Sequence, residues 1–492
     1  MKRAKTGPND RAKGASAERR DLRQMELDRR GGAPLYRQLY ERIAQSIKDG
    51  TLRPGERLPS ARSLAAQLAT SRGTVDLAYS LLSSDGYVLT LGAAGTVVAR
   101  APAEPRKGRP ALQRARGQLT VESDAEVIPP VPFAMGLPAF DAFPRKLWSR
   151  LTIRRARSLP LHQLNAPPAG YPPLREAIRS YLAVSRGISC STEQLFVTSG
   201  FQSAVGLITR AFFQSGVRIW MEDPGYFMAR LAFKEAGAKL VAVPVDTEGL
   251  NVDAAIAQSP DAGFAFVTPS HQMPLGVSLS QSRRLALLSW AANAEAWVIE
   301  DDYDSEFRYG SRPLPALKSL DQGDRVFYVG TFSKVLFPGL RLGYIVVPLS
   351  TASRVEQICR LFYRDRPIFD QAVVADFITE GHFARHIRRM RQLYAARRAA
   401  LAGALAKVFD GQVNIELQAG GMHLLARFSG GESDTQLVER ANAAKLWPAA
   451  LSPWSVEHAC GQGLLLNFTN IPEEKAVEMA HRLRQALLTK IM

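Results

Sequence analysis

Four separated segments carry side chains that could bind and use a small cofactor. Lys334 stands in the apolar run F-S-K-V-L-F, where a lysine can have a lowered pKa and act as an amine nucleophile. Asp301 and Tyr303 follow the apolar stretch W-V-I-E. A carboxylate there could keep a pyridine nitrogen protonated, and a phenol could hydrogen-bond a ring oxygen. Surface acids at a strand end and a metal site are the alternatives, although no histidine nearby in the sequence supports a metal.

Two of the segments suit a phosphate group. In L-F-V-T-S-G-F-Q-S-A, a strand should end at Val197 and a helix should begin near Phe201, so Gly200 would let the backbone approach an anion at the helix N-terminus. A plain strand–helix turn explains that segment equally well. In G-T-F-S-K-V-L-F-P-G-L-R, the hydroxyls and the arginine are groups that bind phosphate.

Tyr226 in M-E-D-P-G-Y is presented by a tight Pro-Gly turn and could stack on a flat aromatic ligand or pack as core. The four segments together match the needs of pyridoxal phosphate: a lysine for its aldehyde, an acid for its pyridine nitrogen, a phosphate cradle and an aromatic ring. The sequence therefore favours pyridoxal 5'-phosphate as the cofactor.

These segments must be positioned by a sheet. From Val131 onward, seven apolar runs alternate with helical stretches, which predicts a largely parallel α/β sheet covered on both faces. Ligands bind beyond the carboxyl ends of strands in such sheets. The runs are 195–197, 217–220, 240–245, 263–267, 297–300, 326–329 and 342–347.

Residues 34–100 predict a different fold, three helices and a hairpin. The helical spacing of the first helix ends at Gly50. Ser60 can cap the second helix, and Ser71 can cap the third. Strands are expected at 87–91 and 96–100, on either side of G-A-A-G. This is a winged helix-turn-helix, in which the third helix enters the major groove of DNA. The first 120 residues carry 23 Lys and Arg against 11 Asp and Glu, and this excess suits a polyanion, although a solvated basic surface is the alternative.

The expected domain organisation has four parts: a basic flexible arm (1–30), the winged helix (31–100), a linker (101–130) and the cofactor domain (131–492). The linker assignment rests on seven prolines and glycines and little apolar content. Three distant cysteines exclude a disulfide scaffold and fit a cytoplasmic protein, and no apolar run reaches the length of a membrane helix. His382 and His386 lie at i and i+4 of a helix, but no carboxylate completes a metal site, so no metal is expected.

The segment from P-L-Y-R-Q-L-Y to S-R-G-T-V-D-L-A-Y resembles the GntR-type winged helix, and residues 131–492 resemble the fold-type I aminotransferases. The combination is similar to the MocR group of GntR regulators, which includes regulators responsive to GABA and to taurine. T-P-S-H-Q-M-P-L-G, Y-D-S-E-F-R-Y and G-T-F-S-K-V-L-F-P-G-L-R-L-G-Y are close matches. The resemblance implies DNA contacts from Arg62, Arg72, Thr74 and Gly95, and a homodimer.

The resemblance also implies a role for each residue of the cofactor site. Lys334 would form the internal aldimine, Asp301 would pair with the pyridine nitrogen, Tyr303 would contact the ring oxygen, and Tyr226 would stack. The residues implied to hold the phosphate are Ser199, Gly200, Phe201, Thr331, Ser333 and Arg341, with Gln202 close by.

Three positions depart from these families. Ala61 stands before Arg62, where Glu or Lys is frequent, which affects the expected base preference. Met273 replaces an asparagine that touches the cofactor ring oxygen. Leu465 replaces an arginine that grips the substrate carboxylate, and losing that pair would weaken carboxylate binding by several kcal/mol.

We therefore expect a cytoplasmic, DNA-binding transcriptional regulator whose cofactor domain senses an amine, an amino acid or a vitamin B6 vitamer. A working aminotransferase with an accessory DNA-binding domain is the alternative. A winged-helix repressor that has lost the cofactor is a third possibility, which the intact Asp301, Tyr303 and Lys334 argue against.

Overall fold

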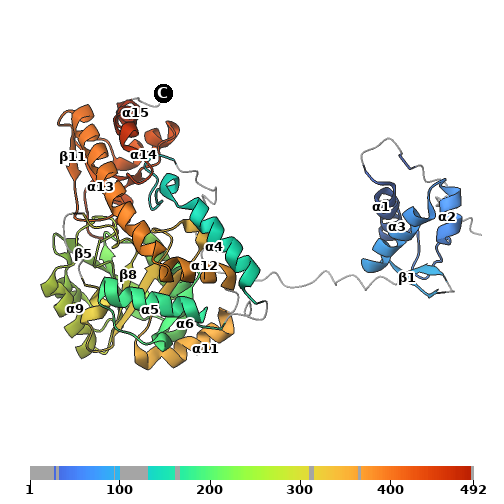
Figure 1. Ribbon diagram of the computed structural model, residues 1–492, viewed down its shortest axis with the longest axis horizontal. Helices are drawn as coiled ribbons and strands as arrows, with labels where there is room; N and C mark the ends of the chain where they lie inside the picture. The colour runs from blue at the N-terminus through green and yellow to red at the C-terminus, as the bar shows by residue number, and fades with distance from the viewer. Residues whose placement is uncertain are drawn as a thin grey trace, which may run out of the picture. The chain divides into compact units, whose positions relative to one another are not determined.

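The structure is a computed structural model, and it describes residues 27–28, 33–92, 95–99, 131–160, 167–309, 315–363 and 367–488. Almost all of the predicted arm, the predicted linker and the hairpin residues Ala93 and Ala94 lie outside these ranges. The chain divides into two compact units, 1–124 and 125–492, and each is described by itself (Figure 1).

The first unit has the predicted three helices and hairpin. Ser60 Oγ accepts a hydrogen bond from Ser63 N, and Ser71 Oγ accepts one from Thr74 N, so the two predicted caps form. The buried core includes Leu39, Ile43 and Leu64. The elements are α1 (Leu35–Lys48), α2 (Ala61–Gln67), α3 (Arg72–Ser84), β1 (Val88–Thr90) and β2 (Thr96–Val98).

The two strands of the hairpin are shorter than the sequence predicts. They pair antiparallel with Val88 opposite Val98, and the ladder stops at Thr90 and Thr96. Beyond that point Leu91 N bonds to Gly95 O across the turn, and Gly95 has a φ of +91°, which a strand does not allow. The glycine therefore ends the strand pairing.

The second unit is built on an eight-stranded sheet with the order β3-β10-β9-β8-β7-β4-β5-β6. Most neighbours are parallel, whereas β10 and β6 run antiparallel to theirs. Each of the seven predicted runs overlaps a strand, and only end residues such as Val217 and Val347 lie outside it. The strands are β3 (Leu195–Thr198), β4 (Arg218–Asp223), β5 (Lys239–Asp246), β6 (Gly249–Leu250), β7 (Phe264–Val267), β8 (Trp297–Asp302), β9 (Val326–Thr331) and β10 (Gly343–Val346).

Helices cover both faces of this sheet. Successive side chains of each strand point to opposite faces, and the apolar ones on each face are buried by the helices that pack there. On β8, Val298 packs in one buried cluster with α8 and α9, and Ile299 packs in another with α6, α7 and α11. Helices α5 and α12 pack against the remaining part of the first face. These helices are α5 (Pro172–Arg186), α6 (Phe201–Phe212), α7 (Phe227–Glu235), α8 (Val252–Gln258), α9 (Gln281–Asn293), α11 (Ala352–Phe362) and α12 (Ile368–Thr379).

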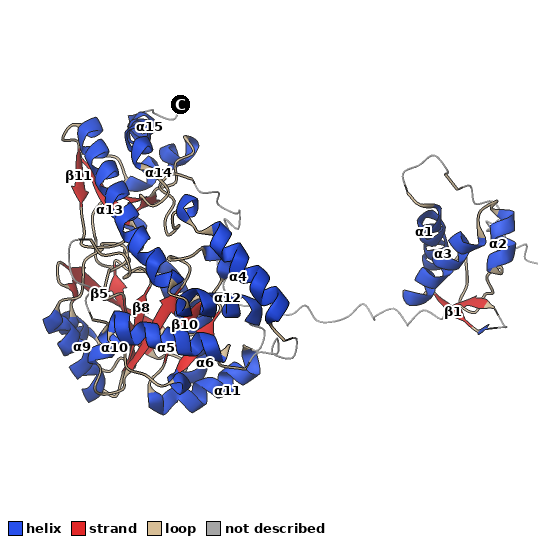
Figure 2. Ribbon diagram, in the orientation of Figure 1, coloured by secondary structure: helices blue, strands red, loops and turns tan. Residues whose placement is uncertain are grey.

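A second, four-stranded antiparallel sheet with the order β11-β12-β14-β13 lies at the end of the unit that carries the C-terminus (Figure 2). The 28-residue helix α13 runs from this end toward the large sheet and packs against α15 (Figure 1). The remaining elements are α4 (Arg145–Ser158), α10 (Leu317–Leu320), α13 (His382–Phe409), β11 (Val413–Glu416), β12 (His423–Phe428), α14 (Asp434–Ala443), β13 (Ala449–Ala450), β14 (Leu464–Asn467) and α15 (Ala476–Leu488).

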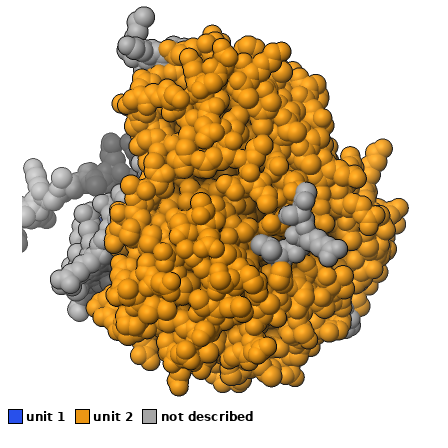
Figure 3. Space-filling view, turned by 90° about the vertical axis from the view of Figure 1, so that its left-hand side faces the viewer, with its two compact units in different colours: residues 1–124 blue, residues 125–492 orange. Residues whose placement is uncertain are grey.

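Figure 3 shows one face of the 125–492 unit, with its described residues in orange. Within the described part of the chain, no helix combines the length and the apolar character needed to cross a membrane.

Candidate functional site

The four predicted loops all leave the large sheet at one edge. Strands β3, β4, β8 and β9 end there, at Thr198, Asp223, Asp302 and Thr331. The antiparallel strand β10 begins at the same edge, and its Gly343 lies opposite both Thr198 and Thr331. The topology therefore gathers segments that are up to 145 residues apart in the sequence.

Contacts between the loops confirm that they converge. The rings of Phe201 and Tyr226 lie 5.4 Å apart. A side chain at Gly343 would lie 3.1 Å from Gly200 Cα, so the loop before β10 touches the start of α6. Burial and, to a lesser extent, the carboxylate of Asp301 raise the pKa of Tyr226, and the same carboxylate opposes the lowering of the Lys334 pKa by burial.

Lys334 reaches the backbone of a segment that precedes the sheet. Its Nζ donates a hydrogen bond to Gly136 O at 3.0 Å. Burial lowers the pKa of Lys334, and the carboxylates of Asp304 and Asp301 partly oppose this. A lysine with a lowered pKa is neutral for a larger fraction of the time, which suits an amine that must attack an aldehyde.

The acidic run at the end of β8 and just beyond it, residues 300–306, separates into partnered and unpartnered carboxylates. Glu300 accepts the backbone N–H groups of Leu317 and Lys318, both at 2.8 Å. The other partnered acids pair as follows: Asp302 with Arg186 and Tyr328, Asp304 with His271, and Glu306 with Tyr181 and Arg186.

Asp301 is the exception. It is 6% exposed, and no described side chain or backbone group hydrogen-bonds or ion-pairs with its carboxylate. Burial and the neighbouring Asp302 raise the pKa of Asp301 well above its ordinary value, while Lys334 lowers it. A buried acid in this state would be stabilised by a bound cationic or N–H donor.

Tyr303 lies just beyond the end of β8, so strand alternation does not decide its direction. Its hydroxyl lies 2.9 Å from His271 Nδ1 and 3.0 Å from His271 O. Asp304 Oδ2 also lies 3.1 Å from His271 Nδ1, and His271 Nε2 is buried without a partner among the described residues. His271 and Asp304 thus hold the phenol at the edge where Asp301 lies.

The predicted phosphate side is open and has free donors. Gly200 precedes α6 with a φ of +93°, no side chain caps this helix, and a Cβ at Gly200 would have nothing within 4 Å. Ser203 Oγ, in the first turn, is buried without a partner among the described residues. This arrangement fits an anion at the helix N-terminus.

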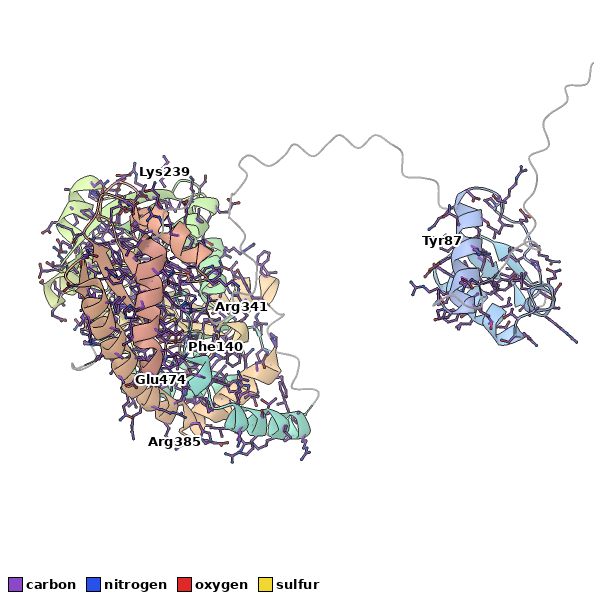
Figure 4. All side chains as sticks on the ribbon, turned by 90° about the horizontal axis from the view of Figure 1, so that it is seen from above. Tyr87, Phe140, Lys239, Arg341, Arg385 and Glu474 are labelled. Carbon is purple, nitrogen blue, oxygen red and sulfur yellow. The ribbon has the colours of Figure 1, made fainter. Side chains whose placement is uncertain are left out.

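The other residues predicted to hold the phosphate differ in whether they already have a hydrogen-bond partner in the protein. Thr331 Oγ1 accepts a hydrogen bond from Ser333 N at 3.1 Å, so this hydroxyl also shapes the turn. Arg341, labelled in Figure 4, is exposed with a φ of +47°, and its guanidinium has no partner among the described residues. Ser199 and Gln202 are exposed beside the α6 N-terminus.

A residue from the C-terminal part of the unit, Trp454, packs against Tyr226. Its ring stacks with Trp454 at 6.4 Å and 23°. Burial raises the pKa of Tyr226 to about 12. Behind the turn, Glu222 accepts hydrogen bonds from Thr268 N and Oγ1, and burial raises the pKa of Glu222 to about 7.

Leu465 lies in an apolar cluster next to this site. It is fully buried in β14, opposite Leu425 of β12, and packs with Leu451 and Trp454. The partly buried residues packed against the cluster are Met135, Tyr226, Met273, Leu275, Ala449 and Cys460. The position therefore offers no charge to a carboxylate.

In the first unit, Arg62 and Arg72 are exposed in the first turns of α2 and α3. Arg72 Nε forms an exposed ion pair with Asp76, at 3.3 Å. Thr74 Oγ1 lies 2.8 Å from the capping Ser71 Oγ, so Thr74 also stabilises the start of α3.

The wing adds an arginine that the sequence did not single out. Arg57 is exposed and pairs with Val97 through an antiparallel bridge, and its Nε would lie 3.8 Å from a Cβ at Gly95. The sequence does not indicate that Arg57 lies beside the wing, because 40 residues separate it from Val97.

Both histidines of α13 have partners within the protein. His386 Nε2 contacts Val335 O at 2.9 Å, and His382 lies beside Glu380 and Arg385. The described residues contain no group of three potential metal ligands.

Gly136, Asp223 and Trp454 also lie outside the sequence prediction. Each acts through a partner more than 190 residues away: Lys334, the backbone of residues 456–458, and Tyr226. The Pro-Gly turn after Asp223 was visible in the sequence, but its partner loop was not.

Known families match both units. The family of bacterial regulatory proteins of the gntR type matches residues 35–98, and the aminotransferase class I and II family matches residues 153–471. The chain is 37% identical to the probable rhizopine catabolism regulatory protein MocR of Rhizobium meliloti, over 94% of this chain and 95% of that protein. It is 33% identical to the pyridoxine biosynthesis transcriptional regulator PdxR of Corynebacterium glutamicum, over 75% of this chain and 78% of that protein.

Among solved structures, the chain resembles the kynurenine aminotransferase of Pyrococcus horikoshii, crystallised in complex with PMP. The TM-score is 0.66 at 28% identity, over 73% of this chain and 92% of that one.

Proposed function

The chain belongs to the MocR-type transcriptional regulators, in which a GntR-type DNA-binding domain is joined to an aminotransferase class I and II domain, and we propose that it senses a small amine through the cofactor site of the second domain. The cofactor is pyridoxal phosphate. When bound, this group supplies an aldehyde that reacts with amines and a ring that withdraws electrons. DNA is the partner of the first domain.

Asp301 is the observation on which the site assignment rests. It is a buried carboxylate without a protein partner in the described chain, at the sheet edge where Lys334 and Tyr226 also lie. The pyridine nitrogen of the cofactor would supply the missing donor. The same contact would bring the pKa of Asp301 down from its raised value, because the ionised form would then have a cationic partner.

The remaining residues would hold the cofactor around that contact. Lys334, with its lowered pKa, would present a neutral amine to the aldehyde. Tyr303 would hydrogen-bond the ring oxygen while His271 and Asp304 hold it in place, and Tyr226 would cover a ring face. The phosphate would be held by the uncapped start of α6 and by Arg341. The full proposed set for the phosphate is Ser199, Gly200, Phe201, Thr331, Ser333 and Arg341, with Gln202 beside it.

In the DNA-binding domain, Arg62, Arg72 and Thr74 would contact DNA from the first turns of α2 and α3, and Gly95 from the wing. Helix N-termini also offer backbone N–H groups to phosphates. Arg57 extends this surface to the wing. The proposal includes a homodimer, which has twice the 54.0 kDa mass of one chain, and a cytoplasmic location, where DNA is available.

The effector that we propose is an amine without a carboxylate, or a B6 vitamer. The apolar cluster around Leu465 adjoins Tyr226 and Met273, and the Leu465 side chain carries no charge, so a carboxylate placed against it would lose its water without gaining a partner from this position.

Matched ligand pairs test this function. Leucine and 3-methylbutylamine differ only in the carboxylate, as do phenylalanine and 2-phenylethylamine. Each is titrated into cofactor-loaded protein while the visible spectrum and operator binding are followed. We expect the amines to change both at concentrations at least tenfold lower than the amino acids. Equal or better binding of the amino acids contradicts the effector class, and a spectral change without any change in operator binding contradicts sensing.

A working aminotransferase is the second candidate. Lys334, Asp301 and Tyr303 are favourably arranged for it, because all three lie at one sheet edge. Multiple-turnover assays with amino donors and keto acids separate the two functions, since a sensor completes no catalytic cycle.

A further inference from the structure

A buried carboxylate holds the middle of the loop between β13 and β14 to the large sheet, and His458 Nε2 adds a contact to Ala242 O of β5 at 3.3 Å. Asp223, the last residue of β4, is 1% exposed. Its carboxylate accepts three backbone hydrogen bonds, from Val456 N and Glu457 N at 2.8 Å and from His458 N at 2.7 Å. Three backbone N–H donors on one carboxyl group form a directional contact.

The same attachment fixes Trp454 against the turn that carries Tyr226. The Trp454 carbonyl accepts hydrogen bonds from Gly225 N at 3.1 Å and from Arg230 Nη1 at 3.0 Å. Its ring stacks on Tyr226 and meets Phe227 edge-on at 5.3 Å. Gly225 is required in this turn, because a Cβ there would lie 2.0 Å from Glu222 O.

A second aspartate holds the two ends of the loop, but to a different element. Asp434 at the start of α14 accepts hydrogen bonds from Ser452 N, Ser452 Oγ and Gly463 N, at 2.6–3.1 Å. It is fully buried and resembles Asp223 in chemistry. The loop is therefore held to the C-terminal part of the unit by Asp434 and to the large sheet by Asp223, and only the second attachment leads directly to Tyr226.

We propose that Asp223 is a positioning residue that sets the Tyr226 ring through the 456–458 backbone and Trp454. This inference rests on the proposed function, in which Tyr226 covers a face of the cofactor ring. Movement of the C-terminal part of the unit would then reach the cofactor through this loop, since the loop joins the two sheets. Asp223 itself need not touch the cofactor.

The test compares Asp223→Ala, Asp223→Asn and Asp434→Ala in the full-length protein. Two readouts are used: hydrogen exchange at the amides of residues 456–458 without cofactor, and the induced circular dichroism and affinity of bound pyridoxal phosphate. Asp223→Ala should speed exchange at these amides, reduce the dichroic band at matched cofactor occupancy and weaken cofactor binding about tenfold. Asp223→Asn keeps one carbonyl oxygen, which can accept from Glu457 N and His458 N, but it turns an NH2 group toward Val456 N, so it should restore only part of both signals.

Asp434→Ala is the matched control, and it should leave the dichroic band at its wild-type amplitude. Trp454→Leu tests the same path with the carboxylate intact, should Asp223→Ala fail to fold, and it should reduce the band as Asp223→Ala does. An unchanged band in both Asp223→Ala and Trp454→Leu, or equal losses in the two aspartate variants, overturns the proposal. A wild-type protein without any cofactor band overturns the proposed function instead, and the exchange at residues 456–458 still decides whether Asp223 holds the loop.

Discussion

Lys334 Nζ and Gly136 O are joined by a hydrogen bond of 3.0 Å across 198 residues of sequence. Gly136 has a φ of +74°, and a Cβ added there would lie 2.4 Å from Lys334 Nζ. The segment that carries Gly136 is itself held by Asn467, whose Nδ2 donates to Ala134 O and Leu137 O at 2.6 and 3.1 Å. The amino group of Lys334 is therefore positioned by the segment that contains Gly136, which is distant in the sequence and close only in the folded protein.

Gly136→Ala should displace Lys334 and lower cofactor loading, because the new methyl group would occupy the place of the lysine Nζ in a left-handed backbone conformation. Visible absorbance per chain after incubation with pyridoxal phosphate measures the loading. Gly403→Ala on α13 is the control, since its Cβ would have nothing within 4 Å. Full loading of Gly136→Ala would contradict the positioning role.

Lys334→Ala should abolish the visible imine absorbance and the response to amines, while basal DNA binding survives in a domain with its own core. Coupling between effector and DNA is reciprocal, so operator DNA should shift effector affinity in the wild type by a factor worth about 1–3 kcal/mol. Effector titrations with and without operator measure this. Lys239→Ala, at an exposed lysine labelled in Figure 4, is the control. A full amine response in Lys334→Ala would refute sensing through this lysine.

Arg72→Ala should weaken operator binding by about 1–3 kcal/mol if the guanidinium contacts a base, and it should leave the cofactor spectrum unchanged. Fluorescence anisotropy with labelled operator measures the affinity. Arg37→Ala is the matched control, because Arg37 forms a similar exposed i,i+4 ion pair with Glu41 on α1. Wild-type affinity should also fall steeply with salt. An unaltered affinity in Arg72→Ala, or a flat salt dependence, would count against this surface as the DNA contact.

Glu222→Gln should flatten the pH dependence of stability. Burial raises the pKa of Glu222 from 4.5 to about 7, so the folded state binds its proton more tightly than the unfolded state. The resulting stabilisation is complete below pH 4.5 and is lost as pH rises through about 7, with a magnitude on the order of 3 kcal/mol. Urea unfolding between pH 5 and 8, followed by tryptophan fluorescence, measures it, because all six tryptophans lie in the 125–492 unit. The pKa of Glu300 is also raised to about 7, so Glu300 should still make the stability of Glu222→Gln fall with rising pH, but less steeply than in the wild type. An unchanged dependence of stability on pH in Glu222→Gln would disprove the assignment to Glu222.

Leu465→Arg should destabilise the protein by about 3–5 kcal/mol, because it buries a charge without a partner. Ligands with a carboxylate should recover part of this loss, so leucine should raise the melting temperature more in the variant than in the wild type. Leu464→Arg is the matched control, since Leu464 is equally buried but packs in a different cluster. If leucine has the same effect in both variants, Leu465 does not face the effector.

The sequence alone determined the two kinds of domain and most of their strands and helices. Both depend on local signals: the caps Ser60 and Ser71, the apolar runs of the parallel sheet, and the turn at Gly200 are each readable within ten residues. Lys334, Asp301 and Tyr226 could be singled out as a set because a parallel sheet places the ends of its strands at one edge.

The partners of those residues were decided only by the tertiary structure. Four neighbouring acids look alike in the sequence, but hydrogen bonds to Arg186, His271 and the backbone of residues 317–318 leave Asp301 as the unpartnered one. Gly136, Asp223 and Trp454 likewise acquire their roles from contacts that span about 200 residues or more. A hydrogen bond depends on the distance between donor and acceptor in space, and the local periodicity of the sequence does not indicate which distant segment supplies the partner.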